Sequence, residues 1–261
     1  MQVKDKSDFY NIIIYAVFVF AFSGLLLLLH SVFVSAGDYW MVFPQFAPVL
    51  TVVFLLVIKG RKRIGFDPAY SFSINKKVLI CSICSALFVL IVFWGFGFFL
   101  SVAGKPFSQW EIPLLEWETP SLFIGFVCVL LGCIGEEIGW RGYLLPALNR
   151  NYSLIASSLF IGVLWGAWHL DFSDGVVGFF VTILFFIPLS IIISWIQTKS
   201  GGSIIPAIVL HFFVNFFARS TLLDMSLTAH LILALLLVII AIVLFFADRK
   251  TFTSKEFAEI A

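Results

Sequence analysis

Long apolar runs occupy most of this chain and constrain its fold more than any other feature. Runs of about 17–25 apolar residues, the length that crosses a lipid bilayer, can be drawn eight times. They cover residues 9–33, 41–58, 78–103, 121–145, 154–172, 176–198, 203–222 and 228–247. Only 12% of the residues are charged and the mean hydropathy is +1.09, whereas soluble domains carry about 25% charged residues. The sequence therefore predicts an all-α, polytopic membrane bundle of about eight transmembrane helices, with residues 1–261 forming a single integral membrane domain.

The basic residues predict the orientation of this bundle. With eight spans both termini share one side of the membrane, and thirteen Lys and Arg residues fall on that side. The other side has two, Lys105 and Arg219, when Arg141 inside the fourth run is set aside. Because cytoplasmic segments are enriched in Lys and Arg, we expect both termini in the cytoplasm.

No small-residue cleavage site follows the first run, so we expect it to be a retained span. Segment 104–120 combines tryptophans with carboxylates and is expected to lie at the membrane interface.

Ionisable side chains lie inside these apolar runs, beginning with the fourth. An ionisable group at membrane depth costs about 2.5–3.5 kcal/mol on insertion scales, which makes it a candidate for function. Glu137 and Arg141 are four residues apart, so on a helix they face each other and can form an ion pair. Glu136 is rotated from that face by about 100° and has no local cation. A carboxylate of this kind suits a general base or acid. The alternative is that both glutamates pair with Arg141 only to hold helices together.

The fifth run contains His169. A turn at 151–153 would join the fourth and fifth runs in a helical hairpin, and Glu136 and His169 lie at nearly equal distances from it. The hairpin therefore predicts that the two side chains reach a similar depth. An intramembrane histidine can also be a hydrogen-bonded structural residue. We expect that role for His30 and His230, which have no acidic neighbour at helical spacing.

The seventh run carries His211 and Asn215, again four residues apart on one helical face. Their ring and amide N–H groups could stabilise an oxyanion. The alternative is a hydrogen bond between helices.

Glycines form a stripe in the fourth run, at positions 132, 135, 139 and 142, and Gly162 and Gly166 form another in the fifth run. Small residues let helix backbones approach closely in lipid. We expect the fourth and fifth helices to pack together through these glycines, with a dimer interface as the alternative.

The three polar signatures together resemble the CPBP family, which comprises the type II CAAX prenyl endopeptidases and their bacterial relatives. The family pattern is Glu-Glu-x-x-x-Arg, then Phe-x-x-x-His, then His-x-x-x-Asn or Asp. The matching residues here are Glu136, Glu137 and Arg141, then Trp165 and His169, then His211 and Asn215. The motif-bearing core covers about 120–222. It departs from the family at Trp165, where Phe is usual, which affects the shape of the pocket wall.

The resemblance implies a glutamate-type intramembrane endopeptidase that cleaves a peptide bond in a membrane-associated peptide or a prenylated protein. Two residues would activate a water for attack on the peptide carbonyl, Glu136 and His169. Two would bind the developing oxyanion, His211 and Asn215. Three would support the site: Glu137, Arg141 and Trp165.

The resemblance implies no cofactor, but a metal-dependent protease is the nearest alternative. Glu136, His169 and His211 could form a zinc site with two histidines and one carboxylate, although the chain lacks an HExxH motif. A non-enzymatic scaffold or regulator with the same fold is a further alternative, as is a transporter. We expect a peptide or protein substrate and the lipid bilayer as partners, and no nucleic acid. The expected location is the cell membrane, or the endoplasmic reticulum membrane in a eukaryote.

Overall fold

The chain folds into a bundle of helices in a computed structural model, which describes residues 6–33, 43–60, 64, 66–67, 71–102, 119–219 and 226–255. The helices are α1 (Lys6–Phe33), α2 (Ala47–Lys59), α5 (Lys76–Val102), α6 (Thr119–Glu137), the π-helix η5 (Ile138–Leu144), α7 (Leu145–Asn149), α8 (Leu154–Trp168), α9 (Gly175–Lys199), α10 (Ile205–Arg219), α11 (Leu227–Ala247) and α12 (Arg249–Thr253). No β-strand occurs among the described residues, and the predicted all-α class is confirmed. The segment predicted at the membrane interface lies, except for its last two residues, outside them.

The helices differ in how far they could extend across a bilayer. Four contain stretches that are long and apolar enough to span it: Phe9–Leu29, Lys76–Leu100, Gly175–Lys199 and Leu227–Ala247. Three shorter apolar stretches are Phe43–Lys59, Leu154–Trp168 and Ile205–Ala218. The predicted polytopic membrane bundle is therefore confirmed, with some helices shorter than their apolar runs. In the fifth run, for example, α8 ends at Trp168, and the chain turns at Leu170, whose φ is +48°.

The fourth run is not one continuous α-helix. It consists of α6, the π-helix η5 and α7, and η5 begins directly after Glu137. Short π-helical segments are rare and often lie at functional sites. The predicted turn between the fourth and fifth runs is confirmed, because α7 ends at Asn149 and α8 begins at Leu154. The Ser153 hydroxyl caps α8 by accepting a hydrogen bond from the Ala156 amide at 3.4 Å.

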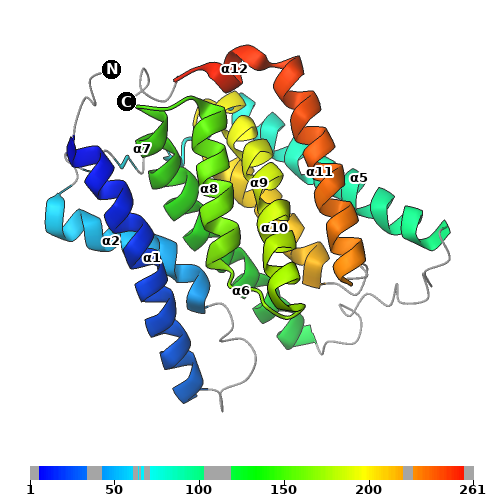
Figure 1. Cartoon of the computed structure of the whole chain (residues 1–261), viewed down its shortest axis with the longest axis horizontal. Coiled ribbons are helices and arrows are strands. Elements are labelled where there is room, and N and C mark those ends of the chain that lie inside the picture. Colours follow the sequence, from blue (N-terminus) through cyan, green and yellow to red (C-terminus); the bar gives the residue numbers. More distant parts are fainter. Residues whose placement is uncertain are drawn as a thin grey trace.

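Helix α9 lies between α8 and α11, while α10 packs against α5, α6 and α9 (Figure 1). Helices α1 and α2 cross each other on the opposite side of the bundle from α5 (Figure 1). Buried side chains from α1, α2, α5, α8, α9, α10 and α11 form one hydrophobic cluster. The polar residues predicted for the site come from the middle of this arrangement, where α6, η5, α8 and α10 meet.

The glycine stripes pack differently from the prediction. A Cβ on Gly139 would lie 2.3 Å from Pro48 Cβ, so this stripe faces α2, and a Cβ on Gly162 would lie 2.6 Å from the Ile187 Cα of α9. The predicted packing of the fourth and fifth helices through their glycines is therefore wrong, because each stripe is covered by a different neighbour. Both contacts lie within the chain, so these glycines do not supply a dimer interface.

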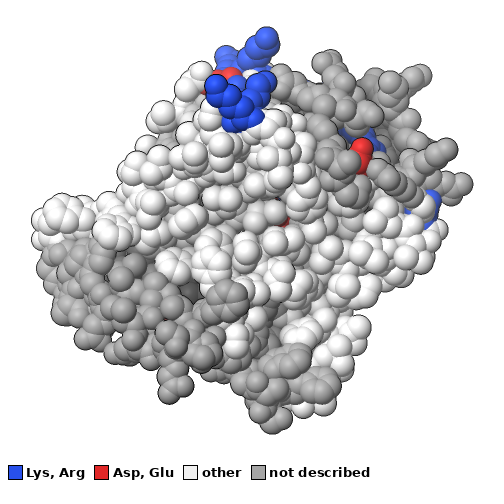
Figure 2. Space-filling view, turned by 180° about the vertical axis from the view of Figure 1, so that it is seen from behind, with Lys and Arg blue, Asp and Glu red and all other residues white. Residues whose placement is uncertain are grey.

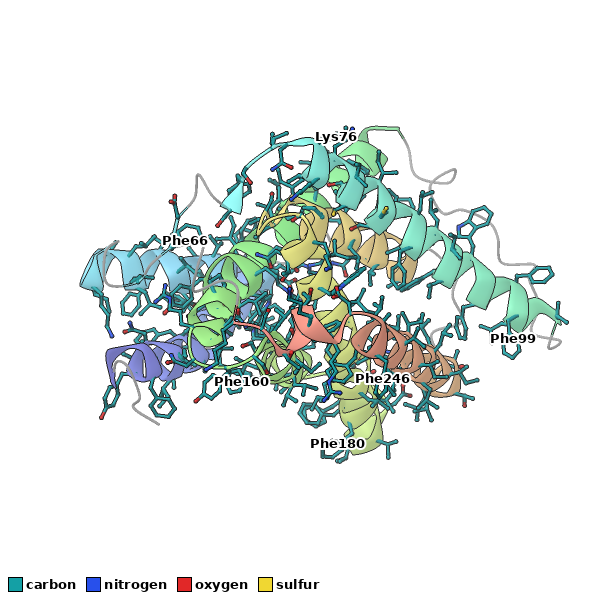
Figure 3. All side chains as sticks on the ribbon, turned by 90° about the horizontal axis from the view of Figure 1, so that it is seen from above. Phe66, Lys76, Phe99, Phe160, Phe180 and Phe246 are labelled. Carbon is teal, nitrogen blue, oxygen red and sulfur yellow. The ribbon has the colours of Figure 1, made fainter. Side chains whose placement is uncertain are left out.

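The surface of the bundle suits a lipid environment. Large apolar side chains point outward from most helices, and Phe99 and Phe180, which are 56% and 62% exposed, lie at its outer edge (Figure 3). On the face shown in Figure 2, the described Lys and Arg residues lie in the upper half, and the lower half has no described charge. Both α12 and the beginning of α1 lie at this upper end (Figure 1). The charge distribution agrees with the predicted orientation.

Candidate active site

Glu137 lies at the junction of α6 and η5, where its carboxylate contacts two other side chains. Its Oε1 atom accepts a hydrogen bond from Arg141 Nη1 at 3.1 Å and lies 2.8 Å from Nδ1 of His211. The side chains of Glu137 and Arg141 are fully buried, and His211 is 3% exposed. The ion pair predicted from the four-residue spacing is present. The contact with His211, which comes from α10, could not be derived from that spacing.

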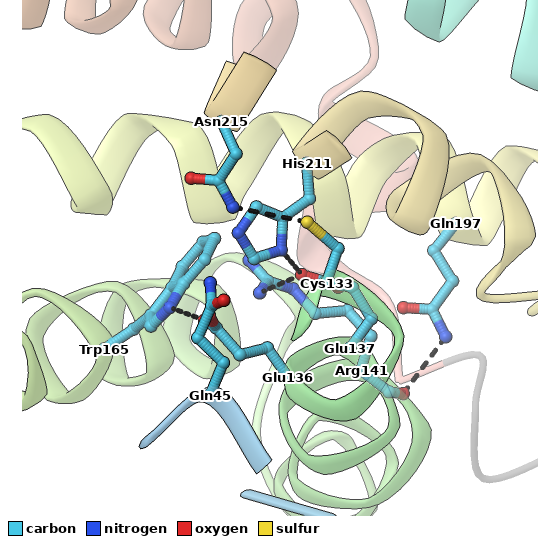
Figure 4. A network of polar contacts seen from close by, with 9 residues as sticks. All are labelled: Gln45, Cys133, Glu136, Glu137, Arg141, Trp165, Gln197, His211 and Asn215. Carbon is cyan, nitrogen blue, oxygen red and sulfur yellow. Dashed lines mark hydrogen bonds and ion pairs between the residues drawn. The ribbon is translucent and has the colours of Figure 1, made fainter. Parts of the chain in front are cut away.

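Glu136 points away from this ion pair, as helical periodicity predicts (Figure 4). It is 1% exposed, and each of its carboxylate oxygens accepts one hydrogen bond from a neutral donor. Gln45 Nε2 donates to Oε1 at 2.9 Å, and Trp165 Nε1 donates to Oε2 at 2.7 Å. Two neutral donors orient the carboxylate without neutralising it, which preserves its capacity to accept a proton.

His169 is the C-cap of α8, and one of its ring nitrogens has a defined role. Nδ1 lies 2.8 Å from the main-chain carbonyl oxygen of Trp165. Because a carbonyl only accepts hydrogen bonds, Nδ1 carries the proton and Nε2 of the neutral ring has the lone pair. The ring stacks on Phe186 at a centroid distance of 4.1 Å. In the described structure Trp165 thus contacts both Glu136 and His169, and no direct hydrogen bond joins those two.

Asn215 lies one turn beyond His211 on α10, and the two side chains share a face as predicted. Its Nδ2 atom donates to the sulfur of Cys133 on α6 at 3.2 Å (Figure 4). An amide nitrogen has two hydrogens, so the second remains available to a ligand. Cys133 therefore orients the amide of Asn215.

A pocket of ≈ 170 Å³ opens beside these residues between α5, α9, α10 and α11. His169, His211 and Asn215 lie in its lining, together with aromatic and aliphatic side chains such as Phe93 and Phe186. Pockets lined mainly by apolar groups with a few convergent polar atoms are typical of ligand sites. Three of the four predicted catalytic residues, His169, His211 and Asn215, therefore line one apolar pocket, and Glu136 is connected to this region through its hydrogen bond with Trp165.

Sequence reasoning missed several residues of this region. Gln45 and Cys133 bind Glu136 and Asn215, and His230 lines the pocket, with Asp171 near enough to interact with it electrostatically. Gln45 is a polar residue in an apolar run, which was a usable signal. His230 has an acidic neighbour only through tertiary packing, because Asp171 follows α8. Hydrogen bonds from Ser173 and Thr182 hold the pKa of Asp171 below its usual range, although burial opposes the shift.

The predicted zinc alternative requires three ligands that converge on one point. Among the described residues, no three His, Cys, Asp or Glu side chains are placed to hold a metal ion. Both oxygens of Glu136 face hydrogen-bond donors, and the Nδ1 atom of His211 faces Glu137. The residues named for zinc therefore do not form a ligand set in this arrangement.

The fold and the site define a class: a helical membrane protein with a buried, oriented carboxylate and two histidines beside an apolar pocket. Residues 118–217 match the family model described as "Type II CAAX prenyl endopeptidase Rce1-like". A search of curated proteins finds "CAAX prenyl protease 2" of Methanococcus maripaludis, which is 32% identical over 151 residues. That match covers 52% of this chain and 52% of the relative, so the chain spans about half the length of the curated relative it matches. Both matches agree with the resemblance to the CPBP family that the three motifs predict.

Proposed function

We propose that this chain is an intramembrane endopeptidase in which Glu136 and His169 activate a water molecule. The observation that carries the proposal is the state of Glu136: a buried carboxylate, oriented by two neutral donors, one of which belongs to the residue that also binds His169. The family and the relative are both named as proteases, which supports a peptidase.

In the proposed reaction, water gives one proton to the couple formed by Glu136 and His169. His169 can accept it at Nε2, because its Nδ1–H is already donated to the Trp165 carbonyl. The resulting hydroxide attacks the carbonyl carbon of the scissile peptide bond. The same couple returns the proton to the amide nitrogen as the C–N bond breaks, which yields a carboxylic acid and an amine; the acid then passes its proton to the amine, giving a carboxylate and an ammonium group.

We assign His211 and Asn215 to the oxyanion that forms on the attacked carbonyl. Asn215 offers the N–H that Cys133 does not engage. His211 donates from Nε2 only in its imidazolium form, since Nδ1–H faces Glu137. The Glu137 carboxylate stabilises that cation, so Arg141 and Glu137 support the oxyanion side of the site. Preorganised donors of this kind are often the largest contribution to catalysis.

The proposed reaction needs no metal ion. The hydrogen bonds at Glu136 and His211 support this proposal. Both carboxylate oxygens of Glu136 accept hydrogen bonds, and Nδ1 of His211 contacts Glu137, so these atoms already have partners other than a metal ion. Chelator-treated protein is expected to keep its full activity with no metal bound. Activity that is lost with the chelator and restored by zinc would favour the metal-dependent alternative.

We infer that the substrate is a membrane-associated peptide or protein with an apolar group near the scissile bond. The pocket beside His169 and His211 has aromatic and aliphatic walls, which suit such a group. The name of the relative adds a prenylated protein as the substrate to test first. We further propose the cell membrane as its location with both termini cytoplasmic, or the endoplasmic reticulum membrane in a eukaryote.

The test is cleavage of a farnesylated peptide that ends in Cys and three further residues, by the full chain in liposomes. The wild type should cleave it, Glu136→Gln should lose about 10³-fold or more in rate, and Asp248→Asn, far along the chain from the site, should keep it. A non-prenylated copy of the peptide shows whether the lipid group is required. No cleavage by the wild type would favour a scaffold, a regulator or a transporter, and equal cleavage rates for the wild type and Glu136→Gln would overturn the role of Glu136.

A further inference from the structure

Trp165 is the residue through which the two proposed water-activating groups are connected. Its indole Nε1 donates to Glu136 Oε2 at 2.7 Å, and its carbonyl oxygen lies 2.8 Å from His169 Nδ1. One contact involves the side chain and the other the main chain, so a single residue sets the position of both groups. The family motif usually has Phe at this position, and Phe has no N–H. The resemblance to the family therefore does not predict the hydrogen bond from the Trp165 indole to Glu136.

The indole ring is fixed on every side. Trp165 is completely buried, and the Arg141 guanidinium carbon lies 4.3 Å from its ring centroid. His211 meets the ring edge-to-face at 5.0 Å, and Phe186 packs on it at 4.5 Å. A guanidinium over an indole face is a favourable cation–π contact. The indole of Trp165 therefore contacts three side chains of the site: Glu136, Arg141 and His211.

The main chain at Trp165 is fixed as well. Gly166 lets α8 approach α9 so closely that a Cβ on it would lie 2.7 Å from the Ile183 Cα. A backbone held this tightly cannot shift without separating the two helices. The carbonyl that orients His169 is consequently rigid.

We propose that Trp165 is a positioning residue that holds Glu136 through its indole N–H and His169 through its carbonyl. This rests on the proposed function, because it concerns the orientation of the groups that activate water. The indole N–H donates to the carboxylate oxygen that Gln45 does not engage, so rotation of the Glu136 carboxylate requires both hydrogen bonds to break. Loss of the N–H leaves the Glu136 carboxylate held by Gln45 alone, so that it turns more readily, which lowers the rate of the chemical step and not the affinity for substrate.

The activity test compares Trp165→Phe with Trp195→Phe. Trp195 also donates its indole N–H to a carboxylate, Asp248 Oδ2 at 2.8 Å, but that pair lies where α9 meets the end of α11, away from the site. Trp165→Phe should lower kcat about 10-fold or more with KM within about 2-fold of the wild type. Trp195→Phe should keep both constants. A wild-type kcat in Trp165→Phe, or an increase in KM alone, would overturn the proposal.

A spectroscopic test separates the hydrogen bond from the activity and from any folding defect of Trp165→Phe. In protein labelled with ¹⁵N-tryptophan, Glu136→Ala should move the indole N–H resonance of Trp165 upfield and leave that of Trp195 unchanged. Asp248→Ala should do the reverse. A Trp165 resonance that does not respond to Glu136→Ala would overturn the proposal. If instead the resonance responds but Glu136→Gln cleaves substrate like the wild type, the hydrogen bond stands and the proposed function fails.

Discussion

Adjacent glutamates in this chain have different chemical environments, and the partners of each side chain explain the difference. Glu137 contacts Arg141 and His211, so its negative charge is balanced within the site. In the described part of the chain, the hydrogen bonds to Glu136 come from two neutral N–H donors, Gln45 and Trp165. Isolated charges in an apolar interior are costly, and hydrogen bonds to a charged group offset part of that cost. These contacts support the proposed roles, in which Glu137 balances charge within the site and Glu136 accepts a proton from water.

Removal of the Gln45 amide should affect catalysis more than folding. Gln45→Leu loses a hydrogen bond to a charged group, which is worth about 1.5–3 kcal/mol, so kcat should fall about 10- to 100-fold. Asn11→Leu is the matched control, because Asn11 accepts a hydrogen bond from Lys59 between α1 and α2, outside the site. Steady-state kinetics on both variants, with thermal unfolding in detergent, check the prediction. Equal kinetic losses in the two variants would contradict it.

At the scale of helices, close backbone approaches set the geometry on which the site depends. Helices α8 and α9 meet at Gly162 and Gly166, one turn and one residue from Trp165, while Gly139 in η5 meets Pro48 and Tyr15. Sequence spacing identified the glycines but not their neighbours. The length of the apolar runs predicted a helical membrane bundle, and helical periodicity predicted the separation of Glu136 from Glu137 and the shared face of His211 and Asn215. It could not predict contacts with Gln45, because no local pattern records which distant segments pack together.

Enlargement of one of these glycines should therefore separate α8 from α9. In Gly162→Ala the new Cβ would lie 2.6 Å from the Ile187 Cα, so we expect a loss of about 1–3 kcal/mol in the free energy of unfolding. Gly95→Ala on α5 is the control, since no atom lies within 4 Å of its Cβ position. That variant should be neutral or slightly stabilised, because alanine favours the helix. Unfolding curves that coincide for the two variants would show that the α8–α9 contact is loose.

The junction of α9, α11 and α12 has a predictable pH dependence. Burial alone would raise the pKa of Asp248, but hydrogen bonds from Lys199, Trp195 and Thr251 and the charge of Lys199 outweigh it and lower the pKa to about 2. Since the folded-state pKa is below the usual 3.8, the carboxylate stabilises the fold above about pH 4. Asp248→Asn should lower the unfolding midpoint at pH 7, and the difference should shrink between about pH 4 and pH 2. If the difference in unfolding midpoint between the wild type and Asp248→Asn stays constant from about pH 4 to about pH 2, packing and not the charge of Asp248 causes it.

The described part of the molecule combines an apolar periphery with Lys and Arg residues towards one end, which is consistent with a bilayer around its middle. Helix α11 is 21 residues long and ends next to α12, which begins with Arg249 and Lys250. Because basic residues mark the cytoplasmic side, the end of α11 should face the cytoplasm and its beginning the opposite side. The pocket lies within the bundle, so the proposed chemistry takes place at membrane depth.

This orientation can be tested by labelling single cysteines in a background that lacks the four native ones. Thr253→Cys should react with a membrane-impermeant maleimide only from the cytoplasmic side, and Ser226→Cys only from the opposite side. Ser226 is the N-cap of α11 and Thr253 is the last residue of α12, which follows the other end of α11, so each variant serves as the control for the other. The reverse labelling pattern would contradict the proposed topology.

The central claim is that Glu136 directs a water molecule onto a peptide carbonyl, and one measurement tests it most directly. A single turnover of the farnesylated peptide is run in ¹⁸O-labelled water, and the new carboxyl terminus is analysed by mass spectrometry. The wild type should place one ¹⁸O atom in that carboxylate, and Glu136→Gln should form no product on the same timescale. An unlabelled product, or labelled product formed by Glu136→Gln at the wild-type rate, would contradict the account.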